Sequence, residues 1–268
     1  MADDESSSRA PFVTLIGAPT DAHSSFLRGA AGAPPLIRKA LHSPSSNLAA
    51  ENGRELGGDV ALLDIGDLEL DGGAGDFARL RDAAAGARGM ALTLGGDHSI
   101  TFPLVQGLAD IHGPLHILHF DAHPDLYDDF EGDPFSHASP FARIMEAGLA
   151  ARLVQVGIRT LNTHQRAQAT RFGVEIIGCD EYDPARVPIP PAPLYVSIDL
   201  DVFDPAFCPG VSHYEPGGLS VRDVLTVLHR IETRIVGADI VEYNPLRDVG
   251  ERTAYVAAKL IKELAALA

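Results

Sequence analysis

The sequence has few cysteines, no tryptophan and no long apolar run. Its two cysteines, Cys179 and Cys208, form no Cys-x-x-Cys pair and no disulfide framework, so a reducing compartment, the cytoplasm, is the expected location. No apolar stretch reaches the ~18 residues that a membrane-spanning helix needs. Residues 1–10 are acidic and serine-rich, without the apolar segment of a signal peptide or the arginines of a transit peptide. We predict that they form a disordered tail.

Positive charge is also scarce, since 21 lysines and arginines face 37 acidic residues and the formal net charge is −16. This balance excludes DNA and RNA as partners and disfavours an anionic membrane surface. It favours small cationic ligands, although a surface selected for solubility explains it equally well. Hydrophobic residues make up 46% of the 268 residues, which suffices for one buried core in a single domain over residues 11–268.

Eight short apolar runs alternate with helix-like segments. Because most of these runs are continuous rather than alternating, they are typical of strands buried on both faces of a parallel sheet. We therefore predict an α/β fold, a three-layer αβα sandwich around an eight-stranded, mostly parallel sheet, with an eight-stranded barrel as the alternative. The predicted strands are Phe12–Ala18, Val60–Gly66, Ala91–Gly95, Leu115–Asp121, Leu153–Ile158, Val174–Gly178, Leu194–Asp201 and Ile235–Glu242. The predicted helices are Phe77–Arg88, Ser99–Asp110, Pro140–Ala147, Ser220–Ile231 and Arg252–Leu267.

Four of the predicted strands end in residues that bind metals. Ligands of such folds bind at the carboxyl ends of the strands, where these residues would meet. Side chains at i and i+2 of an extended backbone point the same way, so we expect convergence within Asp-x-His-x-Asp and within Asp-x-Asp. The residues concerned are His98, Asp121, His123, Asp125, Asp199, Asp201 and Glu242. Asp97, beside His98, is expected to cap the next helix instead.

Four crowded aspartates would repel one another unless cations lay between them. Two divalent ions balance the charge of four carboxylates, which indicates a two-metal centre. The ligands are oxygens and imidazoles without thiolate, so manganese is favoured over zinc, while nickel, cobalt and iron also remain compatible.

These motifs resemble those of the ureohydrolases, the family that includes arginase, agmatinase and formimidoylglutamase. The resemblance is carried by Gly95-Gly96-Asp97-His98-Ser99, by Asp121-Ala122-His123-Pro124-Asp125 and by the stretch Ser197–Phe207. It extends from about His23 to the C-terminus and includes the predicted helix start at Ala33-Pro34-Pro35. Within the family, Phe135–Ser139, Val154–Arg159 and Pro209–Ser220 are most similar to plant-type arginases.

The resemblance implies a role for each site residue. One metal would be held by His98, Asp121, Asp125 and Asp199, and the other by Asp121, His123, Asp199 and Asp201. Catalysis would involve Asp125, which moves a proton to the departing amine, together with His137 and Glu242. Glu242 would bind the guanidinium through two parallel hydrogen bonds, and His137 would orient substrate or shuttle protons. His213 and His23 are further candidates for substrate binding, although each could simply stabilise its loop.

The substrate stays open between arginine and its rivals. The favoured reaction converts L-arginine and water to L-ornithine and urea; agmatine and other guanidino or formimino compounds are the alternatives. The loop 126–139 contains Asp128, Asp129, Glu131 and Asp133, which would repel the α-carboxylate of arginine and so favour agmatine. Possible donors to that carboxylate are Arg159, Asn162 and His23. A non-catalytic regulatory homologue and a single-zinc deacetylase-like hydrolase are rival classes. The family also implies a homo-oligomer, a trimer or hexamer.

Overall fold

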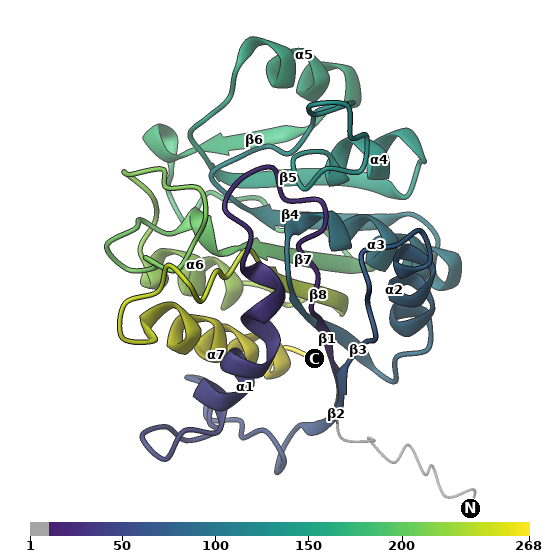
Figure 1. Cartoon of the computed structure of the whole chain (residues 1–268). Coiled ribbons are helices and arrows are strands. Elements are labelled where there is room, and N and C mark those ends of the chain that lie inside the picture. The colour runs from purple at the N-terminus through teal and green to yellow at the C-terminus, as the bar shows by residue number, and fades with distance from the viewer. Residues whose placement is uncertain (1–10) are drawn as a thin grey trace, which may run out of the picture.

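The computed structural model describes residues 11–268, so the predicted tail at residues 1–10 lies outside the described residues. Its strands form one sheet in the order β2-β1-β3-β8-β7-β4-β5-β6, and every neighbouring pair is parallel. The sheet has two edges, β2 and β6, and helices cover both of its faces (Figure 1). The predicted three-layer sandwich is thus confirmed, and the barrel alternative is wrong.

The eight predicted strands are all present, with ends that shift by up to three residues. They are β1 Phe12–Ala18, β2 Ala61–Asp67, β3 Met90–Gly95, β4 Leu115–Phe120, β5 Ala150–Ile158, β6 Glu175–Gly178, β7 Leu194–Asp199 and β8 Ile235–Val241. The α-helices are α1 Ala33–Leu41, α2 Asp76–Ala85, α3 Thr101–His112, α4 Pro140–Glu146, α5 Thr163–Phe172, α6 Val221–Leu228 and α7 Arg252–Ala265. Two short 3-10 turns, η2 His98–Ile100 and η4 Leu200–Val202, follow β3 and β7.

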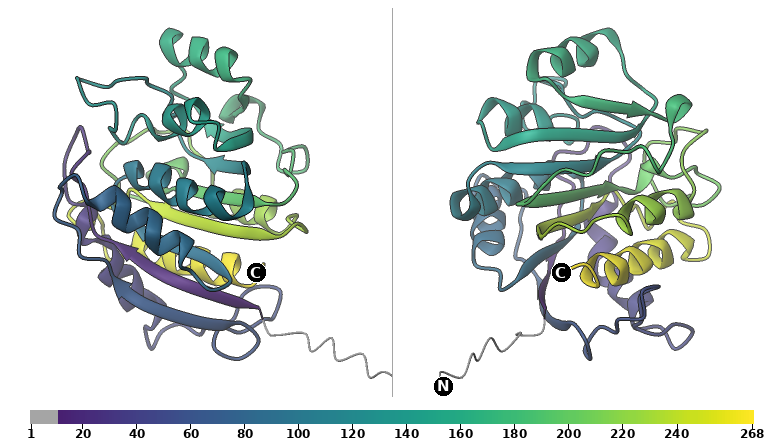
Figure 2. Two further views of the ribbon diagram at one scale, coloured as in Figure 1. Left: turned by 90° about the vertical axis from the view of Figure 1, so that its right-hand side faces the viewer. Right: turned by 180° about the vertical axis from the view of Figure 1, so that it is seen from behind.

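The central strands are mostly apolar because each face of the sheet packs against helices. One core cluster joins strand residues such as Leu92 and Val196 to α1, α6 and α7, and a second joins Ile117 and Tyr195 to α2, α3, α4 and α5. Figure 2 shows the helices on the two sides of the twisted sheet. Among residues 11–268, no helix combines the length and the apolar character required to cross a bilayer.

Helix α5 was not predicted from the sequence. Its residues are mostly polar and exposed, so the apolar periodicity that marks a buried helix face is weak. Its ends carry the usual signals, since the Asn162 side chain accepts a hydrogen bond from the Gln165 backbone and Gly173 adopts a left-handed conformation.

The order of the strands concentrates the polar strand ends in one place. β3, β8, β7 and β4 are consecutive neighbours in the sheet, and their carboxyl ends lead into His98, Glu242, Asp199 and Asp121. The loop after β3 also passes close to another segment, because a Cβ on Gly96 would lie 1.7 Å from the Thr20 carbonyl oxygen. Gly96 in turn accepts a hydrogen bond from the Glu242 backbone at 2.9 Å, which ties the end of β3 to the end of β8.

Candidate metal centre

The buried imidazole of His98 lies among three carboxylates. Its Nδ1 is 3.2 Å from Asp121 Oδ2, 3.0 Å from Asp125 Oδ2 and 3.3 Å from Asp199 Oδ2. This nitrogen is fully buried and has no hydrogen-bond partner among residues 11–268. A second group lies beside it, where His123 Nδ1 is 2.9 Å from Asp201 Oδ2 and 3.4 Å from Asp121 Oδ1. Asp121 therefore directs one carboxylate oxygen to each group.

The carboxylates of this cluster favour positive charge between them. Burial, together with the charges of Asp201 and Asp121, raises the pKa of Asp199 well above its usual value. Burial and the neighbouring Asp121 likewise raise the pKa of Asp201 to about 6, against the opposing effect of His123. Positive charge between these carboxylates would keep them ionised at neutral pH. The orphaned Nδ1 of His98, facing carboxylate oxygens, is the arrangement that a divalent ion would complete, so these residues fit a metal pair.

A buried hydrogen-bond chain fixes the tautomer of His98. The Ser197 hydroxyl donates to Asp239 Oδ1 at 2.6 Å, so its oxygen can accept the proton on His98 Nε2, 2.9 Å away. Thr101 and Tyr195 donate to the other oxygen of Asp239 at 2.7 and 2.6 Å. With a metal bound, the proton on Nε2 leaves the lone pair of His98 on Nδ1, where it faces the three carboxylates. In the metal-free protein these carboxylates outweigh burial and raise the pKa of His98 well above its usual value.

The convergence of the aspartates has a different cause from the one predicted. The prediction rested on extended backbone through Asp-x-His-x-Asp and Asp-x-Asp, but β4 ends at Phe120 and β7 ends at Asp199. Asp201 lies in the turn η4, and Asp125 adopts a left-handed backbone with φ of 50°. Turns, not strand alternation, bring these side chains together. A left-handed aspartate costs about 1–3 kcal/mol, the kind of strain found at functional sites.

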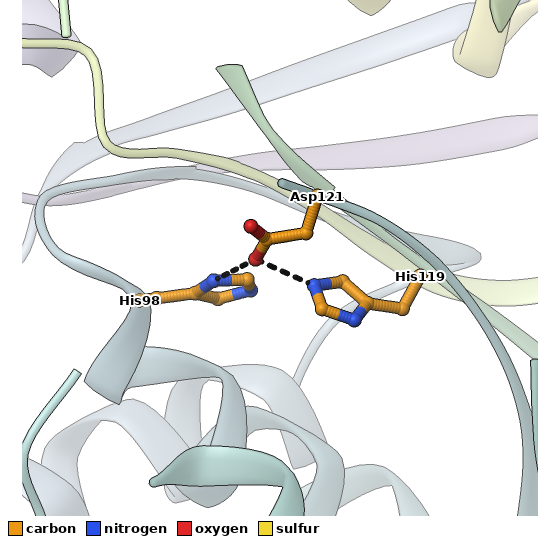
Figure 3. Close-up of side chains that lie close together, drawn as sticks. All are labelled: His98, His119 and Asp121. Carbon is orange, nitrogen blue, oxygen red and sulfur yellow. Dashed lines mark hydrogen bonds and ion pairs between the residues drawn. The ribbon is translucent and has the colours of Figure 1, made fainter. Parts of the chain in front are cut away.

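His119, a fully buried residue of β4, also contacts the centre. Its Nε2 lies 2.8 Å from Asp121 Oδ2, opposite His98, as Figure 3 shows. The Gln155 amide donates both to the Pro124 carbonyl, at 2.6 Å, and to His119 Nδ1, at 3.1 Å. Nδ1 is therefore the acceptor, and Nε2 carries the proton that His119 donates to Asp121. Burial lowers the pKa of His119, in agreement with a neutral ring that orients Asp121 instead of binding metal.

Glu242 and His137 form a buried pair beside the centre. Glu242 Oε1 accepts hydrogen bonds from the His98 backbone, at 2.9 Å, and from His137 Nδ1, at 2.8 Å. Its Oε2 has no partner within the described chain, so one free oxygen, rather than the predicted parallel pair, faces a ligand while His137 stays in place. Burial opposes protonation of His137, but the charge of Glu242 prevails and raises the pKa of His137 to about 9. Glu242 also has a left-handed backbone, with φ of 64°.

The metal-binding side chains open into a pocket. His123, Asp125, Asp199 and Asp201 line it together with His137, His213 and Glu242, whereas His98 and Asp121 lie beneath its surface. The His213 ring is centred 5.2 Å from His137 and 5.9 Å from His123, which puts it beside the centre. The sequence did not single out Ser25, Tyr127, Gln165 and Glu215, which also line the pocket.

His23 is the predicted binding residue that does not line this pocket. Its Nδ1 pairs with Asp133 at 2.7 Å, and its backbone carbonyl accepts from the His137 backbone, so it stabilises the loops around the site. Asp97 accepts hydrogen bonds from Ser99 and from the His23 backbone, which confirms its structural role.

The loop 126–139 lines the pocket, but its acidic side chains do not. Asp128 pairs with His164 at 3.0 Å and Asp133 with His23, and neither Asp129 nor Glu131 lines the pocket. The loop instead presents Tyr127 and Phe130. The electrostatic argument for agmatine therefore fails, because these acidic side chains point elsewhere.

A model of the arginase family matches residues 12–266. The chain belongs to the arginase family. It is 48% identical to arginase 1, mitochondrial, of Arabidopsis thaliana, over 94% of this chain and 80% of that protein. The solved arginase of Medicago truncatula superposes with a TM-score of 0.89 at 43% identity, covering 96% of this chain and 87% of the other. The family membership confirms the resemblance inferred from the motifs.

The relatives also bear on the subgroup. The agmatinase of Bacillus subtilis is 34% identical over 64% of this chain and 61% of its own length, less than the plant arginases in both respects. The plant-type phrases of the sequence thus agree with the whole-chain comparison.

Proposed function

We propose that this arginase-family protein hydrolyses L-arginine to L-ornithine and urea with two divalent metal ions, most suitably manganese. The observation that carries the proposal is the pair of imidazole–carboxylate groups that share Asp121 at the floor of a pocket. The first group would hold one ion through His98, Asp121, Asp125 and Asp199. The second would hold the other through Asp121, His123, Asp199 and Asp201. All of these ligands are oxygens or imidazoles, which suits manganese.

When bound, two divalent ions supply Lewis acidity and lower the pKa of water to near neutrality. The protein's own residues position the substrate and move protons. Glu242 Oε2 accepts a hydrogen bond from the cationic guanidinium and holds its carbon over the centre. Water adds to that carbon, the bond to the alkyl nitrogen breaks, and the departing amine takes up a proton. Asp125 is placed to carry this proton, since its carboxylate lies both in the centre and in the pocket wall.

His137 holds Glu242 and links the pocket to Ser25. Its Nδ1 donates to Glu242, while its Nε2 lies 2.8 Å from the Ser25 hydroxyl and 3.2 Å from the Ser25 backbone nitrogen. The Ser25 backbone N–H donates to Nε2 of the neutral ring, whereas a protonated ring would give up this bond and donate to the Ser25 hydroxyl. This suits a residue that exchanges protons with the pocket.

Arginine is favoured over agmatine by the identity to plant arginases and by the fate of the acidic loop residues, which lie away from the pocket. A homo-oligomer, a trimer or hexamer, and a cytoplasmic location remain proposals. The free thiols of Cys179 and Cys208 are compatible with a reducing compartment.

The test is urea release by purified, manganese-loaded protein with arginine and agmatine in parallel. We expect turnover of arginine, and we expect kcat/KM for agmatine to be at least tenfold lower than kcat/KM for arginine. Urea from agmatine alone would overturn the substrate assignment and leave the reaction class intact. Absence of urea from both, with two ions bound per chain, would overturn the proposed activity.

A further inference from the structure

The outer part of the pocket contains polar groups that take no part in the proposed reaction at the guanidinium. Tyr127, Thr160, Gln165 and Glu215 line it, and they come from the loop after β4, the segment before α5, the first turn of α5 and the loop after η4. No lysine or arginine of the described residues lines the pocket. An anionic group of a substrate must therefore be bound here by neutral hydrogen-bond donors.

Gln165 offers one such donor. Its side chain is buried, and its Oε1 accepts a hydrogen bond from the Leu126 backbone at 3.1 Å. This bond distinguishes the oxygen of the amide from its nitrogen. The amide nitrogen, Nε2, has no hydrogen-bond partner among residues 11–268. Because the side chain lines the pocket, this free N–H group is the part that it presents to a ligand. The nitrogen is not among the fully buried atoms that lack a partner, so a ligand or water in the pocket can reach it.

Tyr127 offers a second donor. Its hydroxyl oxygen accepts from Asn162 Nδ2 at 2.5 Å, so its own proton is free for another acceptor. Its ring is stacked on His164, with centroids 5.4 Å apart and an angle of 10°. Asn162 also caps α5 by accepting from the Gln165 backbone at 2.9 Å, so one residue positions both donors. The positive end of the α5 dipole adds a favourable field for an anion.

Glu215 supplies the opposite charge. Its backbone carbonyl accepts hydrogen bonds from Arg159 Nε and Nη2 at 2.9 and 2.6 Å, which anchors its loop next to Thr160. Glu215 lines the pocket, and its carboxylate forms no ion pair within the described chain. An ammonium group at the outer end of a substrate would neutralise it.

The donors predicted from the sequence are engaged elsewhere. Arg159 donates to the backbone carbonyls of Gly157, Asp201, Val202 and Glu215. His23 pairs with Asp133, and Asn162 acts through Tyr127. None of the three is free to bind a carboxylate.

We propose that Gln165 Nε2 and the Tyr127 hydroxyl bind the α-carboxylate of the substrate and that the Glu215 carboxylate binds its α-ammonium. This inference rests on the proposed function and deepens it, because it assigns the residues that recognise an amino acid in place of a plain amine. Loss of the Gln165 or Tyr127 donor weakens only ligands that carry the carboxylate. Loss of the Glu215 charge weakens only ligands that carry the ammonium.

Three guanidino ligands separate these effects: L-arginine, agmatine, which lacks the carboxylate, and 5-guanidinopentanoate, which lacks the ammonium. Each is measured as a substrate of the manganese-loaded protein or as a competitive inhibitor of arginine turnover. Gln165→Glu keeps the acceptor for Leu126 but replaces the N–H donor by a like charge, and Tyr127→Phe removes one hydroxyl. Gln106→Glu, on α3 and outside the pocket lining, is the matched charge control.

We expect Gln165→Glu to lower kcat/KM for arginine by about 100-fold and Tyr127→Phe by about tenfold, with affinity for agmatine within about threefold of the starting protein. Glu215→Gln should weaken arginine and agmatine by about tenfold each and leave 5-guanidinopentanoate unchanged. Gln106→Glu should change none of them.

Unchanged arginine kinetics in Gln165→Glu, in a protein that releases urea, would overturn the subsite while the activity stands. Equal losses for arginine and agmatine in this variant would do the same, since they would indicate a general disturbance of the pocket. If the unaltered protein releases no urea, the proposed function fails. Calorimetric titration of 5-guanidinopentanoate into the unaltered protein and Gln165→Glu then decides the subsite separately: weaker binding in the variant supports it, and equal or absent binding overturns it.

Discussion

Replacement of Ser197 by alanine tests how the fold prepares His98 for a metal. The change removes the acceptor of the His98 Nε2 proton and one of the three hydroxyl donors to the fully buried Asp239. A buried donor left without a partner costs about 1–3 kcal/mol, and Asp239 loses a charge-assisted bond of about 1.5–3 kcal/mol. We therefore expect the free energy of unfolding to fall by about 2.5–6 kcal/mol.

The same change should weaken metal binding, because His98 can then rotate or take the other tautomer. Loss of a residue that orients a metal-binding histidine typically lowers metal affinity by 10–100-fold. Manganese affinity is measured by competition with a chromophoric chelator, and stability by urea denaturation of the metal-free protein.

Tyr195→Phe is the matched control. It removes a donor from the other oxygen of Asp239 but leaves the bond between Ser197 and His98 in place. It should cost about 1–3 kcal/mol of stability and leave metal affinity within about threefold. Equal metal affinities for Ser197→Ala and the unaltered protein would refute the reasoning, as would an equal loss of affinity in Tyr195→Phe.

Three further results are expected. Glu242→Gln should lower kcat/KM by at least 100-fold while two metals still bind; loss of a metal would show that Glu242 belongs to the ligand set. In the metal-free protein, Asp201 should contribute a loss of stability of about 3 kcal/mol as the pH rises from 4 to 6.5, because its pKa, raised from 3.8 to about 6, makes the folded protein hold a proton longer than the unfolded chain. Thermal melts in which Asp201→Asn shows the same pH dependence as the unaltered metal-free protein, or in which metal-loaded protein shows the same fall, would contradict the electrostatic account. His119→Phe should lower manganese affinity about tenfold without changing the number of ions bound, whereas a loss of one ion would make His119 a ligand.

The sequence was sufficient for the strands and for the residues at their ends. Continuous apolar runs marked the central strands because these are buried on both faces, and the polar residues that follow them stand out against that background. The edge strands β2 and β6 were also found, although they are partly exposed. Helix α5 gave no comparable signal, since a polar surface helix has no apolar stripe, and only its Asn162 cap and Gly173 marked its ends.

The rest of the site depends on contacts between distant segments. His119 could have been suspected, because it precedes Asp121 by two residues at the end of β4 and so points the same way. Gln165 and Ser25 could not, because only the folded chain brings them to the pocket. The acidic loop 126–139 is the opposite case. Its run of charges was visible in the sequence, but it did not predict the direction in which the side chains point.

The most direct test of the account is a manganese titration of the metal-free protein, followed by urea release from arginine. The two groups that share Asp121 predict that activity reaches its maximum at two equivalents per chain, and that Asp201→Asn, which disturbs only the His123 group, retains one tightly bound ion with little activity. Full activity at one equivalent, or an unchanged titration in Asp201→Asn, would contradict a two-metal centre.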